Sequence, residues 1–283
     1  MTLTQKQKNL ESHLKDLGRV VVAFSGGADS ALVLAMSQKV LGNENVLAVT
    51  AESESLAERE LLGAQKVAAE LGVEHLILRT HEMDSPEYRA NPINRCYHCK
   101  SELYSRLQAI AEKRNITHMV NGINQDDLGD HRPGIIAARE FGVLSPLSQA
   151  GFNKNDVREL SRQLGLTTSE KPAMPCLSSR VPYGEPISPE KLAMIEQAED
   201  LLLSLGFTQL RVRHHGEIAR IELLKEEMPE FLADAIAETV QQRFKQIGFK
   251  YVTLDLEGFR SGRLNDGLKE IDQERAEACF KSN

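Results

Sequence analysis

The sequence lacks any long apolar run. No stretch approaches the roughly 18 uninterrupted apolar residues that would span a bilayer. The first residues, MTLTQKQKNLESHLKDLG, do not contain the apolar core of a secretory signal. We therefore expect a cytoplasmic protein that has no membrane partner.

The sequence is also short of positive charge and of cysteine. A formal net charge of -7 argues against the broad positive field that nonspecific RNA or DNA binding requires, so nucleic acid is a disfavoured partner. The four cysteines are too few and too widely spread for a disulfide scaffold; they are Cys96, Cys99, Cys176 and Cys279. In a reducing compartment, clustered thiols indicate metal or redox chemistry.

What the chain does contain is the balance of an ordinary globular protein. Hydrophobic residues make up 41% and charged residues 27% of 283 residues. This length exceeds that of a typical single domain, which has about 150 residues. We therefore expect two units or one enlarged one.

Short apolar runs alternate with helical patterns in the first part of the chain. After an amphipathic stretch at 11–17, the pattern predicts strands at 19–24, 46–50, 75–78 and 118–120, and helices at 28–41, 56–71 and 99–113. A loop with Pro86 and Pro92 precedes the last of these helices, and residues 143–146 and 154–164 form the final unit. The alternation predicts an α/β fold, a doubly wound parallel sheet with helices on both faces.

A proline-rich segment separates this part from the rest. Residues 171–189 hold five prolines, so we place the domain boundary there: 1–170, a linker at 171–187 that carries Cys176, and 188–283. Ser188 and Pro189 mark the start of a helix that runs to residue 205. Strands at 209–212, 218–223 and 251–256 and a helix at 229–247 predict a smaller C-terminal α+β domain.

One glycine turn stands out, at the end of the first predicted strand. In SGGADS, residues 25–30, backbone N–H groups and a helix N-terminus converge, and such a point binds an anion. The turn has neither the lysine of a G-x-x-x-x-G-K-[ST] loop nor the spacing of G-x-G-x-x-G. The alternative is a tight turn that merely needs two glycines.

An acidic cluster follows the predicted strand at 118–120. It consists of Asp126, Asp127 and Asp130, with His131 and Arg132. In an open α/β sheet this position is the ligand-binding edge, where a carboxylate could complete a metal or nucleotide site. A solvated turn would also be rich in such residues.

The cysteines form a second candidate centre. Cys96 and Cys99 make a C-x-x-C pair just ahead of a predicted helix, whose N-terminus would lower the thiol pKa. A redox dithiol is one interpretation. If Cys176 folds back to them, three thiolates suit a [4Fe–4S] cluster with an open iron, and zinc with His98 is the competing metal. Three unrelated buried thiols are the remaining alternative, and Cys279 is interpreted as incidental.

A basic strand lies in the second part. Arg211, Arg213 and Arg220 alternate with apolar residues, as in any half-exposed strand. Yet Arg211 and Arg213 point to the same side, with Glu222 on a neighbouring strand, and paired guanidinium groups fit a substrate monophosphate.

The motifs support a resemblance at two levels. SGGADS matches the signature of the PP-loop ATP pyrophosphatases, which attack the α-phosphate of ATP and expel pyrophosphate. Over nearly its full length the chain resembles the LarE family of sulfur transferases, which thiolate the pyridinium dicarboxylate precursor of the nickel-pincer nucleotide. The segments that carry this resemblance are SGGADS, NQDDLGDHRPG, PCLSSRVPYG, LRVRHHGEIARIE and YVTLDLEGFRSGRLND.

The resemblance implies an activity and a set of site residues. Ser25, Gly26, Gly27 and Ser30 would hold pyrophosphate, and Asp29 would position Mg²⁺ or the triphosphate. Arg180 and Glu199 would join the strand arginines at the substrate. The expected reaction adenylates a carboxylate of a pyridinium dicarboxylate mononucleotide and converts it to a thiocarboxylate, with ATP, Mg²⁺ and a [4Fe–4S] cluster as cofactors. A C-x-x-C pair with a third cysteine resembles the cluster-bearing type of this family, so sulfur from a sulfide donor on that cluster is favoured over sulfur from Cys176 itself. We also expect a homo-oligomer.

Other functions use the same loop. A tRNA thiolase would act on a nucleobase carbonyl, although the acidic charge weighs against it. An amidotransferase-like synthetase that uses ammonia is another alternative, but the sequence shows no glutaminase domain. A non-catalytic ATP sensor would bind the nucleotide without releasing pyrophosphate.

Overall fold

The computed structural model describes residues 1–129, 133–260 and 262–265. The chain divides into two compact units, Met1–Cys176 and Leu177–Asn283. The predicted proline-rich linker therefore contains the point of division. No helix in the described part of the chain is long and apolar enough to cross a membrane.

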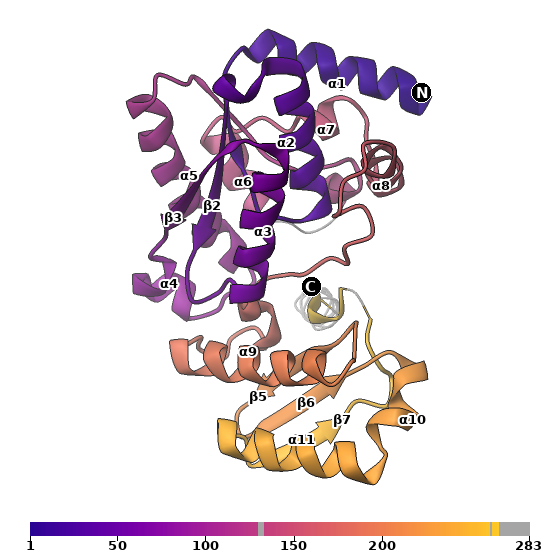
Figure 1. The fold of residues 1–283 in the computed structure, drawn as a ribbon. Helices are drawn as coiled ribbons and strands as arrows, with labels where there is room; N and C mark the ends of the chain where they lie inside the picture. Colours follow the sequence, from indigo (N-terminus) through magenta and orange to yellow (C-terminus); the bar gives the residue numbers. More distant parts are fainter. Residues whose placement is uncertain (130–132, 261, 266–283) are drawn as a thin grey trace, which may run out of the picture. The chain divides into compact units, whose positions relative to one another are not determined.

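The first unit alternates strands with helices (Figure 1). Its strands are β1 (Val20–Ala23), β2 (Val46–Glu52), β3 (Glu74–Arg79) and β4 (His118–Val120). Its helices are α1 (Leu3–Leu17), α2 (Ala28–Leu41), α3 (Glu58–Leu71), α4 (Pro86–Arg89), α5 (Arg95–Lys113), α6 (Pro133–Glu140), α7 (Pro146–Gln149) and α8 (Lys154–Gln163).

These strands form one parallel sheet in the order β3-β2-β1-β4. Val20 pairs with Val46 of β2 on one side of β1 and with His118 of β4 on the other. The chain moves outward from β1 through β2 to β3 and then returns to the opposite side as β4. The point where this order reverses, at the carboxyl ends of β1 and β4, is where open α/β sheets bind ligands.

Helices cover both faces of the sheet. Alternate residues of a strand point to opposite sides, and here the residues on both sides are apolar and must be buried. Val20 and Val22 pack with α1, α2, α3 and α8, whereas Val21, Leu47 and Val49 pack with α5 and α6. The predicted doubly wound α/β fold is therefore confirmed.

Some predicted boundaries differ from the structure. The loop around Pro86 contains the short helix α4, which Ser85 caps by accepting a hydrogen bond from the Tyr88 N–H (3.2 Å). Residues 143–146 do not form a full strand. Leu144 makes an isolated parallel bridge with Val120, and the chain enters α7 at Pro146.

The second unit is a small α+β domain, as predicted. Its elements are α9 (Pro189–Ser204), β5 (Arg211–His215), β6 (Ile218–Glu222), α10 (Met228–Phe231), α11 (Asp234–Ile247) and β7 (Tyr251–Leu254). β5 and β6 are antiparallel, β6 and β7 are parallel, and the three form one mixed sheet. The helix predicted at 229–247 is two helices, since the backbone is extended at Ala233 (φ -60°, ψ 134°).

Candidate functional site

The serine–glycine loop between β1 and α2 closes on itself through serine hydroxyls. Ser30 Oγ accepts a hydrogen bond from the Ser25 N–H (3.2 Å) and donates one to the Gly27 carbonyl (3.1 Å). The hydroxyls of the two serines lie 3.1 Å apart. Gly27 is the N-cap of α2 and brings no capping side chain to the first N–H groups of the helix. An anion is the ligand that this helix end favours.

Two glycines allow the backbone to pack closely around this loop. Gly26 has a φ of 70°, and a Cβ added to it would lie 2.9 Å from Ala64 Cβ on α3. Gly122, just after β4, is so near the start of α2 that an added Cβ would come within 2.7 Å of Ser30 N. The loop is therefore held between α3 and the segment that follows β4, at the switch point of the sheet.

Asn124 connects two carboxylates at the start of α2. Its Nδ2 donates to Asp29 Oδ1 (2.8 Å), and its backbone N–H donates to Asp127 Oδ2 (3.1 Å). Burial raises the pKa of Asp29; the Asn124 hydrogen bond opposes this shift, and the charge of Asp127 adds to it. A divalent cation would offset both burial and repulsion. The two carboxylates fit Mg²⁺, which proteins bind with one or two carboxylates and the substrate's phosphates.

The remaining members of the acidic cluster are placed differently. Asp126 accepts a hydrogen bond from the N–H of Lys154 (2.9 Å), the first residue of α8, whose N-cap is Asn153. Asp130, His131 and Arg132 lie outside the described residues. A ligand role for Asp126 or Asp127 stays a prediction, and the contact with Asn124 favours Asp127.

The C-x-x-C cysteines lie inside α5 rather than ahead of it, because this helix begins at Arg95. Cys96 is exposed and Cys99 is half-buried. Desolvation raises the pKa of the Cys99 thiol to about 12. The pKa of Cys96 is raised as well, by the protein atoms packed around its sulfur and by the nearby Cys176, although part of this residue is open to solvent. The prediction of lowered thiol pKa values is therefore wrong. The cost of desolvating a thiolate outweighs the favourable effect of the helix end here.

Cys176, the last residue of the first unit, lies within electrostatic range of both other thiols. Its charge contributes to the raised pKa of Cys96 and of Cys99. Among residues 1–129, 133–260 and 262–265, however, no three His, Cys, Asp or Glu side chains are close enough together to hold a metal ion. As arranged, the thiols do not fit the predicted [4Fe–4S] cluster, nor zinc with His98. Cys279 lies outside the described residues.

In the second unit, a buried ion pair connects α9 to the segment before it. Arg180 Nε and Nη2 donate to the two carboxylate oxygens of Glu199 at 2.8 and 3.0 Å. The Arg180 side chain is 1% exposed and that of Glu199 is fully buried. Glu199 also accepts a hydrogen bond from the Val212 N–H (3.1 Å), so that it joins the helix to β5.

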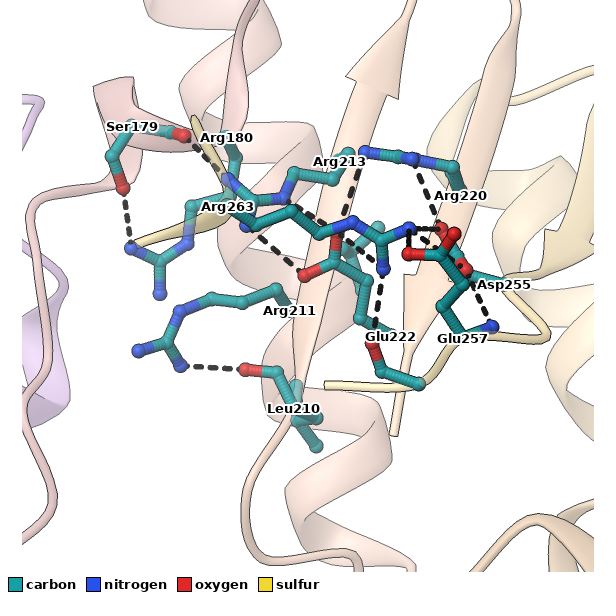
Figure 2. A network of polar contacts seen from close by, with 12 residues as sticks. Ser179, Arg180, Leu210, Arg211, Arg213, Arg220, Glu222, Asp255, Glu257 and Arg263 are labelled. Carbon is teal, nitrogen blue, oxygen red and sulfur yellow. Dashed lines mark hydrogen bonds and ion pairs between the residues drawn. The ribbon is translucent and has the colours of Figure 1, made fainter. Parts of the chain in front are cut away.

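Figure 2 shows a second network, around Glu222 on β6 and Asp255 after β7. Arg213 donates through Nε and Nη2 to the two oxygens of Glu222, each at 3.0 Å. Arg220 lies 3.3 Å from Glu222 and 2.9 Å from Asp255, and Arg263 lies 3.0 Å from Asp255. Three guanidinium groups therefore share two largely buried carboxylates.

Arg211 has a different environment, although it shares a face of β5 with Arg213. Its Nη1 donates to the Leu210 carbonyl (2.6 Å), and its guanidinium lies 5.0 Å from the centre of the Phe259 ring. Burial, followed by the positive charge of Arg180, lowers the pKa of Arg211 to about 10. An anion beside this guanidinium would counteract both effects. A phosphate-binding role for Arg211 stays a prediction.

Some residues of these networks were not predicted. Asn124 stands in the quoted NQDD turn, but only the fold shows that it links two carboxylates. Asp255 and Arg263 stand in the C-terminal motif without an assigned role. Lys171 contacts the Gly26 carbonyl from 145 residues away, and no local pattern indicates such a contact.

The fold and the loop together define a class of protein. A parallel α/β sheet with SGGADS at its switch point has the nucleotide-binding architecture of PP-loop ATP pyrophosphatases. The NAD synthase family matches residues 3–104, which include this loop.

Three relatives narrow the class. An uncharacterized protein of Synechocystis is 48% identical over 263 residues, 93% of this chain and 98% of the relative. The pyridinium-3,5-bisthiocarboxylic acid mononucleotide synthase of Lactiplantibacillus plantarum is 43% identical over 267 residues, 94% of this chain and 96% of the relative. A glutamine-hydrolyzing GMP synthase component of Archaeoglobus fulgidus is 24% identical over 216 residues, 69% of this chain and 67% of the relative. The chain belongs to the family of the pyridinium-3,5-bisthiocarboxylic acid mononucleotide synthase, the LarE family of ATP-dependent enzymes.

Proposed function

We propose that this enzyme adenylates a carboxylate of a pyridinium dicarboxylate mononucleotide and converts it to a thiocarboxylate. The observation that carries the proposal is the 43% identity, over 94% of the chain, to a synthase of a pyridinium bisthiocarboxylic acid mononucleotide. The product of such a reaction belongs to the biosynthesis of a nickel-pincer nucleotide, as the family resemblance implies.

The residues of the first unit support the adenylation step. The loop at 25–30 would hold the pyrophosphate portion of ATP through its N–H groups and the start of α2. Asp29 and Asp127 would hold Mg²⁺, which neutralises charge on the phosphates. A substrate carboxylate oxygen then attacks the α-phosphorus, and pyrophosphate leaves. The acyl-adenylate is activated because AMP leaves readily when a sulfur nucleophile attacks the acyl carbon.

The residues of the second unit support binding of the mononucleotide phosphate. Arg211 is the proposed primary ligand, because its charge is disfavoured by burial and by neighbouring arginines. Arg213 binds the carboxylate of Glu222, and Arg180 binds that of Glu199, through two hydrogen bonds each. These pairs would orient the site, since each carboxylate fixes a guanidinium plane through two hydrogen bonds.

Two sources of the transferred sulfur are considered, and they involve Cys96, Cys99 and Cys176. A [4Fe–4S] cluster held by all three would require the thiols to come closer together than they lie here. Cys176 as a sacrificial donor would require no such rearrangement. The two routes differ in stoichiometry, because a sacrificed cysteine delivers one sulfur per chain, whereas a cluster supplied with sulfide turns over.

The proposal is tested by mixing the anaerobically purified enzyme with ATP, Mg²⁺, sulfide and the pyridinium dicarboxylate mononucleotide. We expect pyrophosphate release that depends on the mononucleotide, and a thiocarboxylate product seen by mass spectrometry. Arg211→Ala should raise the KM for the mononucleotide much more than the KM for ATP. Pyrophosphate release with no dependence on the mononucleotide would contradict the assignment of the substrate.

The sulfur source is decided in the same preparation. An iron and acid-labile sulfide assay reports a cluster, and Cys96→Ala, Cys99→Ala and Cys176→Ala should then each abolish both the cluster and thiolation. If only Cys176→Ala is inactive, and the spent chain is lighter by the mass of H₂S, the cluster proposal is wrong. We also propose that the enzyme is cytoplasmic and that it forms a homo-oligomer. Light scattering after size-exclusion chromatography tests the oligomeric state.

A further inference from the structure

The anion-binding loop contains no cation of its own. The single charged side chain in residues 25–30 is the carboxylate of Asp29. In phosphate-binding loops that end in lysine, the ammonium group supplies positive charge to the phosphates. The fold brings a lysine to this loop from a distant part of the sequence.

Lys171 contacts the loop with its ammonium group. Its Nζ donates to the Gly26 carbonyl (3.1 Å) and lies 2.8 Å from Glu60 Oε2, in the first turn of α3. The side chains of Lys171 and Glu60 are 22% and 15% exposed, so water and salt screen this ion pair weakly. The contact joins three segments: the loop, α3 and the stretch after α8.

The contact also determines which way a peptide group faces. In a trans peptide the C=O and N–H bonds point in opposite directions. Because the Gly26 carbonyl faces Lys171, the Gly27 N–H faces away from the lysine and donates a hydrogen bond to Ser25 Oγ (3.4 Å). The reverse orientation would present a carbonyl oxygen to an anion and repel it.

We propose that Lys171 is a positioning residue for nucleotide binding. Its ammonium group, anchored by Glu60, holds the Gly26–Gly27 peptide with the N–H on the side of Ser25 Oγ, so that this N–H and the serine hydroxyl line the side of the loop where the phosphates would bind. This inference rests on the proposed function, which places the phosphates of ATP at this loop. It also explains why a carboxylate lies near an anion site: Glu60 acts on the lysine and not on the ligand.

The test compares Lys171→Met, Lys171→Arg and Glu60→Gln, with Lys66→Met as the control because Lys66 is 75% exposed on the same helix α3. Binding of ATP with Mg²⁺, and of inorganic pyrophosphate, is measured by calorimetry. Loss of a charge-assisted hydrogen bond predicts binding of both ligands that is about ten- to a hundredfold weaker in Lys171→Met. Lys171→Arg should restore most of the affinity, and Lys66→Met should match the wild type.

Glu60→Gln separates positioning from simple electrostatics. Removal of a negative charge near an anion site should strengthen binding if charge alone matters, whereas loss of the lysine's anchor should weaken it. We expect weaker binding, with the KM for ATP raised more than kcat is lowered. Unchanged binding in Lys171→Met, or tighter binding in Glu60→Gln, would overturn the proposal.

The failure of the proposed function would look different. If the wild type binds ATP but makes no thiocarboxylate from the pyridinium mononucleotide, the substrate assignment fails. The calorimetric comparison of the variants uses no mononucleotide and no sulfur source, so it still decides the role of Lys171.

Discussion

Asp29 is a single side chain whose charge opposes folding. Its carboxylate is buried beside Asp127, and burial raises its pKa. A carboxyl group whose pKa is raised by folding binds its proton more tightly in the folded state. At pH values above this raised pKa, the ionised group therefore destabilises the fold. Such a cost is expected where a site must hold a cation.

We predict that Asp29→Asn raises the melting temperature at neutral pH while pyrophosphate release is lost. The amide retains an oxygen for the Asn124 hydrogen bond but removes the buried charge and the metal ligand. A gain of about 1 kcal/mol would shift the melting temperature by about 2–4 °C for a chain of this size. Calorimetry and a pyrophosphate assay measure the two effects. Asp84→Asn is the control, because its side chain is 86% exposed.

Loss of activity in Asp29→Asn without any thermal stabilisation would mean that Asp29 is well solvated in the folded chain. Full activity would remove Asp29 from the proposed adenylation step.

At the scale of secondary structure, the second unit is held together by charge as well as by its apolar core. Glu199 on α9 accepts hydrogen bonds from Arg180 and from the backbone of Val212 on β5. Glu222 on β6 accepts two hydrogen bonds from the guanidinium group of Arg213 on β5. These ion pairs fix α9 against β5 and β5 against β6, because leaving a buried charge without its counter-ion would cost a large amount of folding free energy.

Glu199→Ala is predicted to destabilise the second unit by about 3–5 kcal/mol, because it leaves the buried Arg180 without its carboxylate. Denaturant unfolding followed by circular dichroism measures this change. The matched control is Glu74→Ala, which breaks the exposed pair with Arg114, whose side chains are 56% and 46% exposed. That change should stay within about 1 kcal/mol. Equal effects of the two substitutions would contradict the argument from burial.

The sequence predicts elements better than it predicts networks. The bounds 28–41 and 118–120 agree with α2 and β4 to the residue, because glycines and apolar periodicity specify them locally. The break at Ala233 was not predicted, since both flanking segments have helical patterns. The pairing of Arg213 with Glu222 depends on the register of β5 against β6, which the residue pattern alone does not specify.

The same limit applies to the cysteines. A C-x-x-C motif at a helix start favours thiolates when the sulfurs are hydrated, but the sequence does not show how deeply each thiol is enclosed. The pKa of about 12 for Cys99 arises from that enclosure. The contact between Lys171 and Gly26 is likewise a property of the folded chain.

At the scale of the whole molecule, three histidines make stability depend on pH. Burial lowers the pKa of His75 in the first unit and of His214 and His215 in the second, from an ordinary value of 6.5. Each group binds a proton more readily in the unfolded chain. Their contribution to stability is therefore complete above about pH 6.5 and is lost as the pH falls toward the lowered values.

We predict that the free energy of unfolding falls between about pH 7.5 and pH 5.5, and that His75→Gln flattens part of this slope. Glutamine retains an Nε2 donor for Thr50 Oγ1, which lies 2.8 Å from His75 Nε2, but does not titrate. Urea unfolding at several pH values gives the slope. His81→Gln serves as the control, since His81 is 47% exposed. A slope that His75→Gln leaves unchanged would assign the pH dependence to other groups.

The position of Lys171 has a consequence for the reach of the reactive sulfur. Cys176 follows Lys171 by five residues, and an extended chain spans at most about 3.6 Å per residue, or about 18 Å in all. While the ammonium group stays on the Gly26 carbonyl, this short stretch of chain keeps Cys176 within that distance of the Lys171 backbone. If Cys176 delivers the sulfur, as in the sacrificial route proposed above, the acyl carbon of the adenylate would have to come within that radius.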